Sequence, residues 1–122
     1  MRYRAMGDKP VVWLGSSRED IRQFPREVRG IAGTELQSVQ REEDPKDFKP
    51  MPTIGSGVYE IRIRTGVEHR VFYVAKFDEA VYVLHAFQKK AKKTAQHDLE
   101  IGRRRYQTLR QQRQATLQRG RH

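Results

Sequence analysis

The sequence contains no cysteine, which excludes a disulfide scaffold and a metal site built from thiolates. It also lacks any apolar run of the roughly 20 residues that a membrane-spanning helix requires. The first nine residues are polar and lack the apolar core of a secretory signal peptide. These absences predict a soluble cytoplasmic protein without a membrane partner, and we expect neither a metal ion nor an organic cofactor.

Acidic residues are scarce in one part of the chain. Of the 122 residues, 36% are hydrophobic and 33% are charged, so one domain with a small core and a charged surface is expected. Residues 1–87 hold 14 Lys or Arg and 13 Asp or Glu, whereas residues 88–122 hold 11 and 2. The net charge of +10 is therefore concentrated in the last third of the chain. This asymmetry favours a polyanionic partner such as nucleic acid, an acidic protein or an anionic membrane.

The hydrophobic pattern predicts a single domain over residues 1–122, with its core between about residues 9 and 110. β-Branched and aromatic runs predict a short first strand and then three strands whose short connections indicate an antiparallel meander. The expected strands are residues 10–14, 58–65, 70–76 and 81–87. The expected helices are residues 17–24, a second helix ending before residue 44, and a last helix from about residue 95. The Pro- and Gly-rich segment 44–57 is expected to be a loop, and residues 111–122 a frayed or disordered basic tail.

The strand expected at residues 58–65 carries the clearest chemical pattern. Its side chains alternate between two faces, so Glu60, Arg62 and Arg64 fall together on a face that we expect to be open. Such groups suit RNA cleavage by the RNA's own 2′-hydroxyl, which needs a base, an acid and positive charge around the phosphate but no metal. Arginine suits the phosphate because its planar fork donates two hydrogen bonds and stays charged.

The candidate site combines these cations with groups able to transfer protons or stack on bases. The candidate catalytic residues are Glu60, Arg62, Arg70, Lys89 and Lys90. The candidate RNA-binding residues are Arg64, Tyr73, His85, Lys92 and Lys93. The possible proton-transfer groups are Glu60, Lys89, Lys90, His85 and His97. Each also has a structural interpretation, because the strand face can simply be solvated, Tyr73 and His85 can belong to the core, and the lysines can serve solubility.

Several motifs, taken in order, resemble a known family. They are residues 11–17 (VVWLGSS), the Phe24-Pro25 break, residues 57–64 (GVYEIRIR), 69–73 (HRVFY) and 81–90 (VYVLHAFQKK), and Lys93-Thr94. Through them, about residues 9 to 110 are similar to the phage-derived HigB-type branch of the RelE/ParE toxins. The resemblance implies an α+β, RelE-like fold, with an antiparallel sheet of about four strands, two N-terminal helices and a C-terminal helix.

The resemblance also implies a function and partners. Most HigB- and RelE-like members cleave mRNA in the ribosomal A site, so the chain is expected to be the toxin of a type II toxin–antitoxin system. Its expected partners are the ribosome, mRNA and a cognate helix-turn-helix antitoxin. The toxin would contact operator DNA only through this antitoxin. The residues that match basic positions of RelE-type sites are Arg62, Arg70, Lys89 and Lys90. Two positions depart, since Glu60 replaces a basic residue and Gln96 or His97 stands where RelE has a late catalytic tyrosine.

Two other functions are open on the sequence. A ParE-type member with the same fold would poison DNA gyrase by binding it and would need no nuclease site. A non-catalytic nucleic-acid-binding protein would use the basic C-terminal segment alone. The cationic strand and the lysines that follow favour the ribosome-dependent endoribonuclease, because phosphate chemistry requires cations held at a fixed place.

Overall fold

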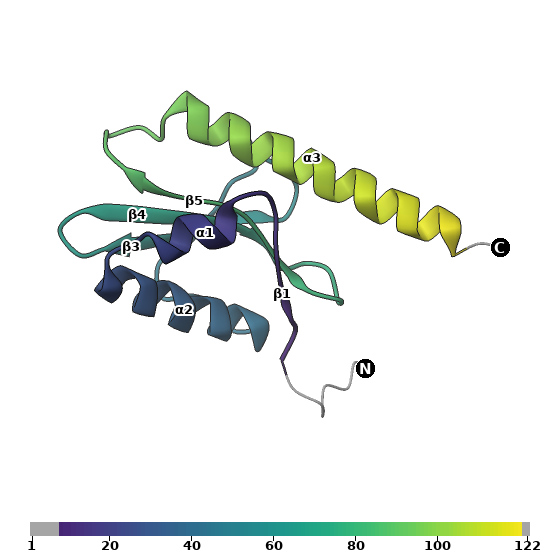
Figure 1. Cartoon of the computed structure of the whole chain (residues 1–122), viewed down its shortest axis with the longest axis horizontal. Coiled ribbons are helices and arrows are strands. Elements are labelled where there is room, and N and C mark those ends of the chain that lie inside the picture. The colour runs from purple at the N-terminus through teal and green to yellow at the C-terminus, as the bar shows by residue number, and fades with distance from the viewer. Residues whose placement is uncertain (1–7, 121–122) are drawn as a thin grey trace.

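A computed structural model describes residues 8–120 and shows five strands and three α-helices (Figure 1). The strands are β1 (Val11–Trp13), β2 (Phe48–Pro50), β3 (Val58–Arg64), β4 (Glu68–Val74) and β5 (Val81–Lys89). The helices are α1 (Ser17–Arg22), α2 (Arg26–Gln40) and α3 (Gln96–Arg119). The α+β class is confirmed, and the arrangement is consistent with a RelE-like fold.

The sheet is mixed rather than wholly antiparallel, and its strand order is β1-β5-β4-β3-β2. The central strands form the expected antiparallel meander, whose β3–β4 turn contains Gly66 at a φ of +100°, a conformation that suits glycine. β1 pairs parallel with β5, because two helices rather than a hairpin follow β1 in the chain. β2 arises in the segment that was expected to be a loop, and Pro50 is tolerated there because β2 is an edge strand.

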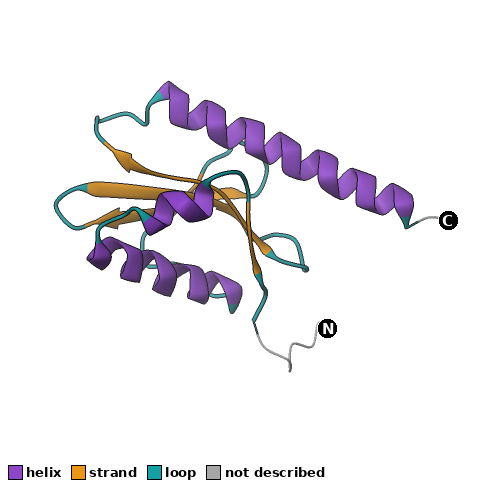
Figure 2. Ribbon diagram, in the orientation of Figure 1, coloured by secondary structure: helices purple, strands orange, loops and turns teal. Residues whose placement is uncertain are grey.

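Helices pack on both faces of the sheet (Figure 2). α1 and α2 cover one face, where Ile61 and Ile63 of β3 are buried. α3 crosses the other face, where Phe72 of β4 lies in a cluster with Tyr106 of α3. The face that was expected to be open is therefore partly closed by α3. As a result Glu60, which lies on this face, has no exposed surface.

A β-bulge in β5 decides which side chains share the α3 face. Phe72 lies opposite His85, whereas the next residue of β4, Tyr73, lies opposite Val83, so Leu84 is an extra residue in β5. The extra residue shifts the alternation by one position. Strict alternation placed His85 with Val83, but Val83 packs in the core under α1 and α2, while the His85 ring lies 6.1 Å from the Phe72 ring.

α3 continues to Arg119, through most of the segment for which a frayed or disordered basic tail was expected, and residues 121–122 lie outside the described part. Polar contacts hold this segment to the rest of the protein, and the spacing of apolar residues does not predict them. Arg113 contacts Glu79 at 2.8 and 3.2 Å, and its guanidinium lies 3.6 Å from the centre of the Phe77 ring. The Arg113 hydrogen bond is the main cause that lowers the pKa of Glu79 to about 2.

None of the helices between residues 8 and 120 combines the length and the apolar character that a membrane-spanning helix needs.

Replacing Arg113 by alanine should lower the free energy of unfolding by about 1–2 kcal/mol, because the variant loses a two-point ion pair and a cation–π contact. Because the pKa of Glu79 is depressed from 4.5 to about 2, the ion-pair part is present above pH 4.5 and is lost as the pH falls through about 2. Urea unfolding at neutral and acidic pH measures both effects. Arg110→Ala, at an exposed position of the same helix, is the control, and an equal loss in both variants would contradict this anchor.

Candidate nucleic-acid interface

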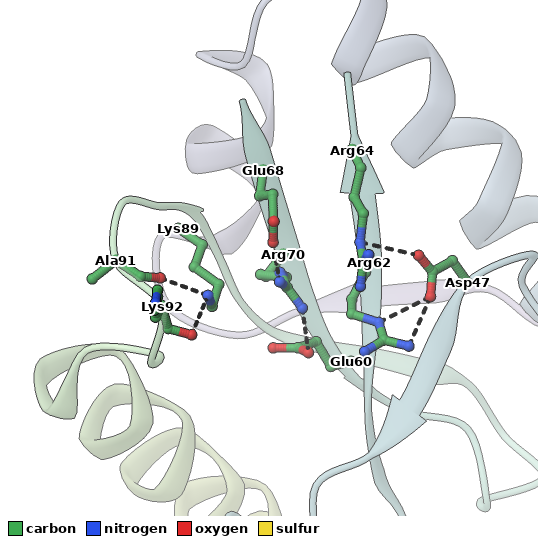
Figure 3. A network of polar contacts seen from close by, with 9 residues as sticks. All are labelled: Asp47, Glu60, Arg62, Arg64, Glu68, Arg70, Lys89, Ala91 and Lys92. Carbon is green, nitrogen blue, oxygen red and sulfur yellow. Dashed lines mark hydrogen bonds and ion pairs between the residues drawn. The ribbon is translucent and has the colours of Figure 1, made fainter. Parts of the chain in front are cut away.

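Strand register brings several of the predicted cations to one end of the sheet (Figure 3). Arg62 in β3 lies opposite Arg70 in β4, and Arg64 lies opposite Glu68. Glu68 in turn lies opposite Lys89, the last residue of β5. Three strands thus contribute cations to one area beside the β3–β4 turn, as the sequence predicted. The carboxylates among them determine which of these cations are available.

Arg70 is buried rather than presented to solvent. Its side chain is 6% exposed and donates a 2.9 Å hydrogen bond to Glu60, whose side chain is fully buried. A second nitrogen of the guanidinium donates to Glu68 at the rim of the sheet. Within the described part of the chain, Glu60 Oε2 and Arg70 Nε have no hydrogen-bond partner. The pair joins β3 to β4, and neither side chain is placed to touch RNA in this structure.

Arg62 and Arg64 share one carboxylate, that of Asp47 in the segment before β2. Asp47 Oδ1 lies 2.9 Å from both Nε and Nη2 of Arg62, and Oδ2 lies 3.4 Å from Arg64 Nε. The Asp47 carbonyl also accepts a 2.8 Å hydrogen bond from the Arg62 amide, which holds the segment to the edge of β3. Sequence reasoning missed Asp47, because only the pairing of β2 with β3 brings it here.

The lysines after β5 form a compact loop at the same end of the sheet. Lys89 Nζ donates to the carbonyl oxygens of Ala91 and Lys92, each at 2.6 Å, so it folds the loop back on itself. A hollow of about 440 Å³ lies between this loop and Glu68. The exposed lysines of the loop are Lys90, Lys92 and Lys93. Their charges face solvent, where a polyanion can reach them.

Tyr73 and His85 were expected to contact RNA, but both are buried. Tyr73 is 3% exposed on the face covered by α1 and α2, where burial raises its pKa, so it lies on the wrong side of the sheet to stack on a base bound near Arg70. His85 is 6% exposed, and its Nε2 lies 2.7 Å from Asp98 Oδ1 in the first turn of α3. Its ring also stacks on Phe87. The structural interpretation of these two residues therefore fits better than the RNA-binding one.

Two buried histidines should make folding sensitive to mild acid. Burial lowers the pKa of His69 and of His85 below 6.5, and for His85 the Asp98 carboxylate opposes the shift. The unfolded chain therefore binds protons more readily than the folded protein. The contribution of these groups to stability is complete above pH 6.5 and is lost as the pH falls through the folded-state pKa values.

Urea unfolding at about pH 7.5 and pH 5.5 tests this prediction, because it brackets the ordinary histidine pKa and stays above that of carboxylates. We expect a lower free energy of unfolding at the lower pH. His69→Phe, next to Phe24 in the core, should reduce the difference, whereas His97→Gln, at an exposed position, should leave it unchanged. A difference of the same size in all three proteins would assign it to other groups.

A groove of about 1,020 Å³ runs between α2 and the end of β3. Gly30 and Ile31 of α2 line it on one side and Ile63 of β3 on the other. The Arg62 and Asp47 side chains also line it, so the groove meets the Asp47 ion pairs. The sequence did not reveal the groove, because its two walls come from elements that lie far apart in the chain.

The arrangement suits the binding of phosphate better than the transfer of protons. Its carboxylates are engaged, since Glu60 is buried and both Asp47 and Glu68 are ion-paired. The hydrogen bond from Arg70 is the main cause that lowers the pKa of Glu68, which makes that carboxylate a weak base. Among residues 8–120, no group of three or more His, Asp or Glu is placed to hold a metal ion.

Comparison with known proteins gives one family match. A family model described as "Phage derived protein Gp49-like (DUF891)" matches residues 19–107. The matched span runs from α1 into α3 and includes the groove, the buried Glu60–Arg70 pair and the lysine loop. A search of curated proteins finds no match.

Proposed function

This chain belongs to the phage-derived Gp49-like family, which is associated with RelE-like toxins, and from that membership we propose that it is the toxin of a type II toxin–antitoxin system. We further propose that it is of the HigB type and that it cleaves mRNA on the ribosome, which stops translation in the cytoplasm. The observation that carries this proposal is the gathering of accessible cations from β3 and from the lysine loop after β5 at a single end of the sheet.

The exposed cations at this end support an RNA target. The Arg64 side chain is 52% exposed and that of Arg62 is 24% exposed, so both are reachable from solvent. The lysine loop adds several exposed amines at the same end of the sheet, on the other side of β4. Phosphates along a single RNA strand can pair with such a series of cations, and each contact releases counterions. Further exposed arginines lie on α3, at Arg104, Arg110 and Arg119.

The expected chemistry is attack of the RNA 2′-hydroxyl on the adjacent phosphorus, with departure of the 5′-oxygen. Guanidinium and ammonium groups would stabilise the negative charge that develops on the phosphate oxygens. The carboxylates at this site are buried or ion-paired, so the protein offers positive charge more readily than a strong base. A need for the ribosome agrees with this, because the ribosome can hold the mRNA in the strained geometry that the attack requires.

A cell-free translation reaction with a defined mRNA tests the proposal. Primer extension should reveal cuts within codons of ribosome-bound mRNA, and the same mRNA without ribosomes should remain intact. A second reaction contains protein with Lys90→Gln and Lys92→Gln. This variant lacks two exposed charges of the loop and should cut less mRNA than the unaltered protein. Intact ribosome-bound mRNA at saturating protein would refute the nuclease proposal.

A ParE-like action on DNA gyrase is the second candidate, and one observation favours it. All three strand arginines are paired with carboxylates of the chain itself, an arrangement that a protein-binding toxin tolerates without loss. Inhibition of gyrase supercoiling in the absence of mRNA cutting would support it. If neither effect occurs, a non-catalytic nucleic-acid-binding role is the one that fits.

The proposed toxin would be silenced by a cognate helix-turn-helix antitoxin and would reach operator DNA only through that partner. The support for this partner is the family membership, since RelE-like toxins are components of two-protein systems. Co-expression with the product of the adjacent gene tests it. The expected result is a complex that is stable in purification and that restores growth, and continued toxicity in its presence would count against the pairing.

A further inference from the structure

The Asp47 carboxylate marks an anion-binding position on the edge of β3. Its two oxygens bridge the guanidinium groups of Arg62 and Arg64, which project from alternate residues of one strand. A phosphodiester also presents two oxygens, and guanidinium groups bind phosphate oxygens as they bind those of a carboxylate. The Asp47 side chain is 38% exposed, so an external anion can approach the same two arginines from solvent.

The groove between α2 and β3 begins at this anion position. Ile31 supplies apolar surface, and the volume of about 1,020 Å³ is ample for a nucleobase with its ribose. The groove is open at Gly30, where a Cβ added to the backbone would meet no atom within 4 Å. The groove therefore joins a bidentate anion position to an apolar wall, so a phosphate and the nucleoside attached to it can be held together.

We propose that this groove binds single-stranded RNA, with a phosphate on Arg62 and Arg64 in place of Asp47 and the adjoining base against Ile31. Asp47 then acts as a built-in competitor that lowers the affinity of the free protein for RNA. This proposal rests on the proposed function and extends it. It adds an RNA subsite at the same end of the sheet and an internal carboxylate that competes with RNA for the arginines. An acidic peptide is the other polyanion that fits the two arginines. RNA is favoured because the lysine loop supplies further cations at the same end of the sheet, beyond Glu68, where the next phosphates of a strand can reach them.

The competition of Asp47 with RNA is tested by binding of a labelled oligouridylate of about ten nucleotides, measured by fluorescence anisotropy without ribosomes at low salt. Asp47→Asn should raise the affinity about fivefold, as expected for release of one partly exposed ion-pair partner. Asp44→Asn removes the same charge from the same segment and should raise it less than about twofold. In protein that also carries Arg62→Gln and Arg64→Gln, the Asp47→Asn effect should vanish. Equal effects of Asp47→Asn and Asp44→Asn, or persistence of the effect without the arginines, would overturn the proposal.

The groove is tested with a matched pair of substitutions in α2. Gly30→Gln places a long uncharged side chain in the groove and should lower the affinity about fivefold, because it occupies the space of the base and removes the burial of the base against Ile31. Gly33→Gln is the control, since Gly33 also has open space but does not line the groove. Both changes favour the helix by up to about 1 kcal/mol, so both proteins should fold. Equal affinities of the two variants would place the RNA elsewhere.

These outcomes separate the subsite from the nuclease activity. A protein that never cuts mRNA can still bind oligouridylate more tightly after Asp47→Asn and more weakly after Gly30→Gln. That result would support the subsite alone. A protein that cuts mRNA on the ribosome but shows neither change would keep the proposed function and lose the subsite. Displacement of oligouridylate by an acidic peptide of equal charge at lower concentration than by RNA would overturn the choice of RNA.

Discussion

Arg70→Ala is expected to destabilise the protein by about 3–5 kcal/mol, which is the range for removing one partner of a buried ion pair. The loss arises because Glu60 has no exposed surface and would keep a buried charge without its 2.9 Å partner. The sequence alone predicts that Arg70→Ala removes toxicity and leaves the fold intact, and the burial of the pair changes that expectation. Urea unfolding, followed by far-UV circular dichroism, measures the loss.

A control and a rescue separate burial from charge. Arg62→Ala, directly opposite Arg70 in the register but partly exposed at the sheet edge, should cost less than about 1 kcal/mol. Joint replacement of the pair by apolar residues, Glu60→Leu with Arg70→Met, should recover most of the stability, because no buried charge is left. If Arg70→Ala unfolds at the same urea concentration as the unaltered protein, the buried pair contributes nothing and Arg70 is free to act on substrate.

Lys89→Ala combined with Lys90→Ala is expected to reduce mRNA cleavage at saturating protein by about 100-fold or more, the size typical for loss of a preorganised charge at a transition state. Lys89 also organises the loop through its bonds to the carbonyls of Ala91 and Lys92, so the change removes charge and placement together. Single-turnover cleavage on programmed ribosomes measures the effect. Ribosome binding should weaken much less, because many other cations remain.

Lys92→Ala with Lys93→Ala is the matched control, since it removes the same charge from exposed positions of the same loop. It should weaken binding and reduce the salt dependence of binding by about two phosphate contacts, but cleavage at saturation should persist. Equal cleavage by the two double variants would show that the loop only attracts RNA. In that case the placement of Lys89 at the end of β5 has no catalytic meaning.

The fold could be predicted from the sequence wherever one residue pattern decides one element. The β-branched and aromatic runs of β3, β4 and β5 and the short turns between them were sufficient for the meander. β2 could not be predicted, because its three residues carry no alternation and acquire their conformation from pairing with β3. The far end of α3 was missed for a similar reason, since Arg113 holds it through Glu79 and Phe77 rather than through an apolar face.

The candidate site was predicted in its composition but not in its exposure. Alternation correctly put Glu60, Arg62 and Arg64 on one side of β3, yet it did not reveal that α3 closes that side over Glu60. The bulge at Leu84 likewise turned His85 toward the α3 face, and no local feature of the sequence signals that extra residue. Asp47 could not be predicted for the same reason as β2. Its contact with two arginines depends on the pairing of two segments that lie apart in the chain.

The two edge strands have a consequence for how the protein behaves at high concentration. β1 and β2 are three residues each, so neither edge offers a long row of free backbone groups to another chain, and Pro50 lacks a donor altogether. β3 extends beyond β2, and there the edge carries Arg62 and Arg64, whose like charges repel the same edge of a second molecule. The guanidinium groups that we propose to bind phosphate would thus also oppose polymerisation through the sheet. A chain with both arginines neutralised should form fibrous aggregates at lower concentration than the natural one.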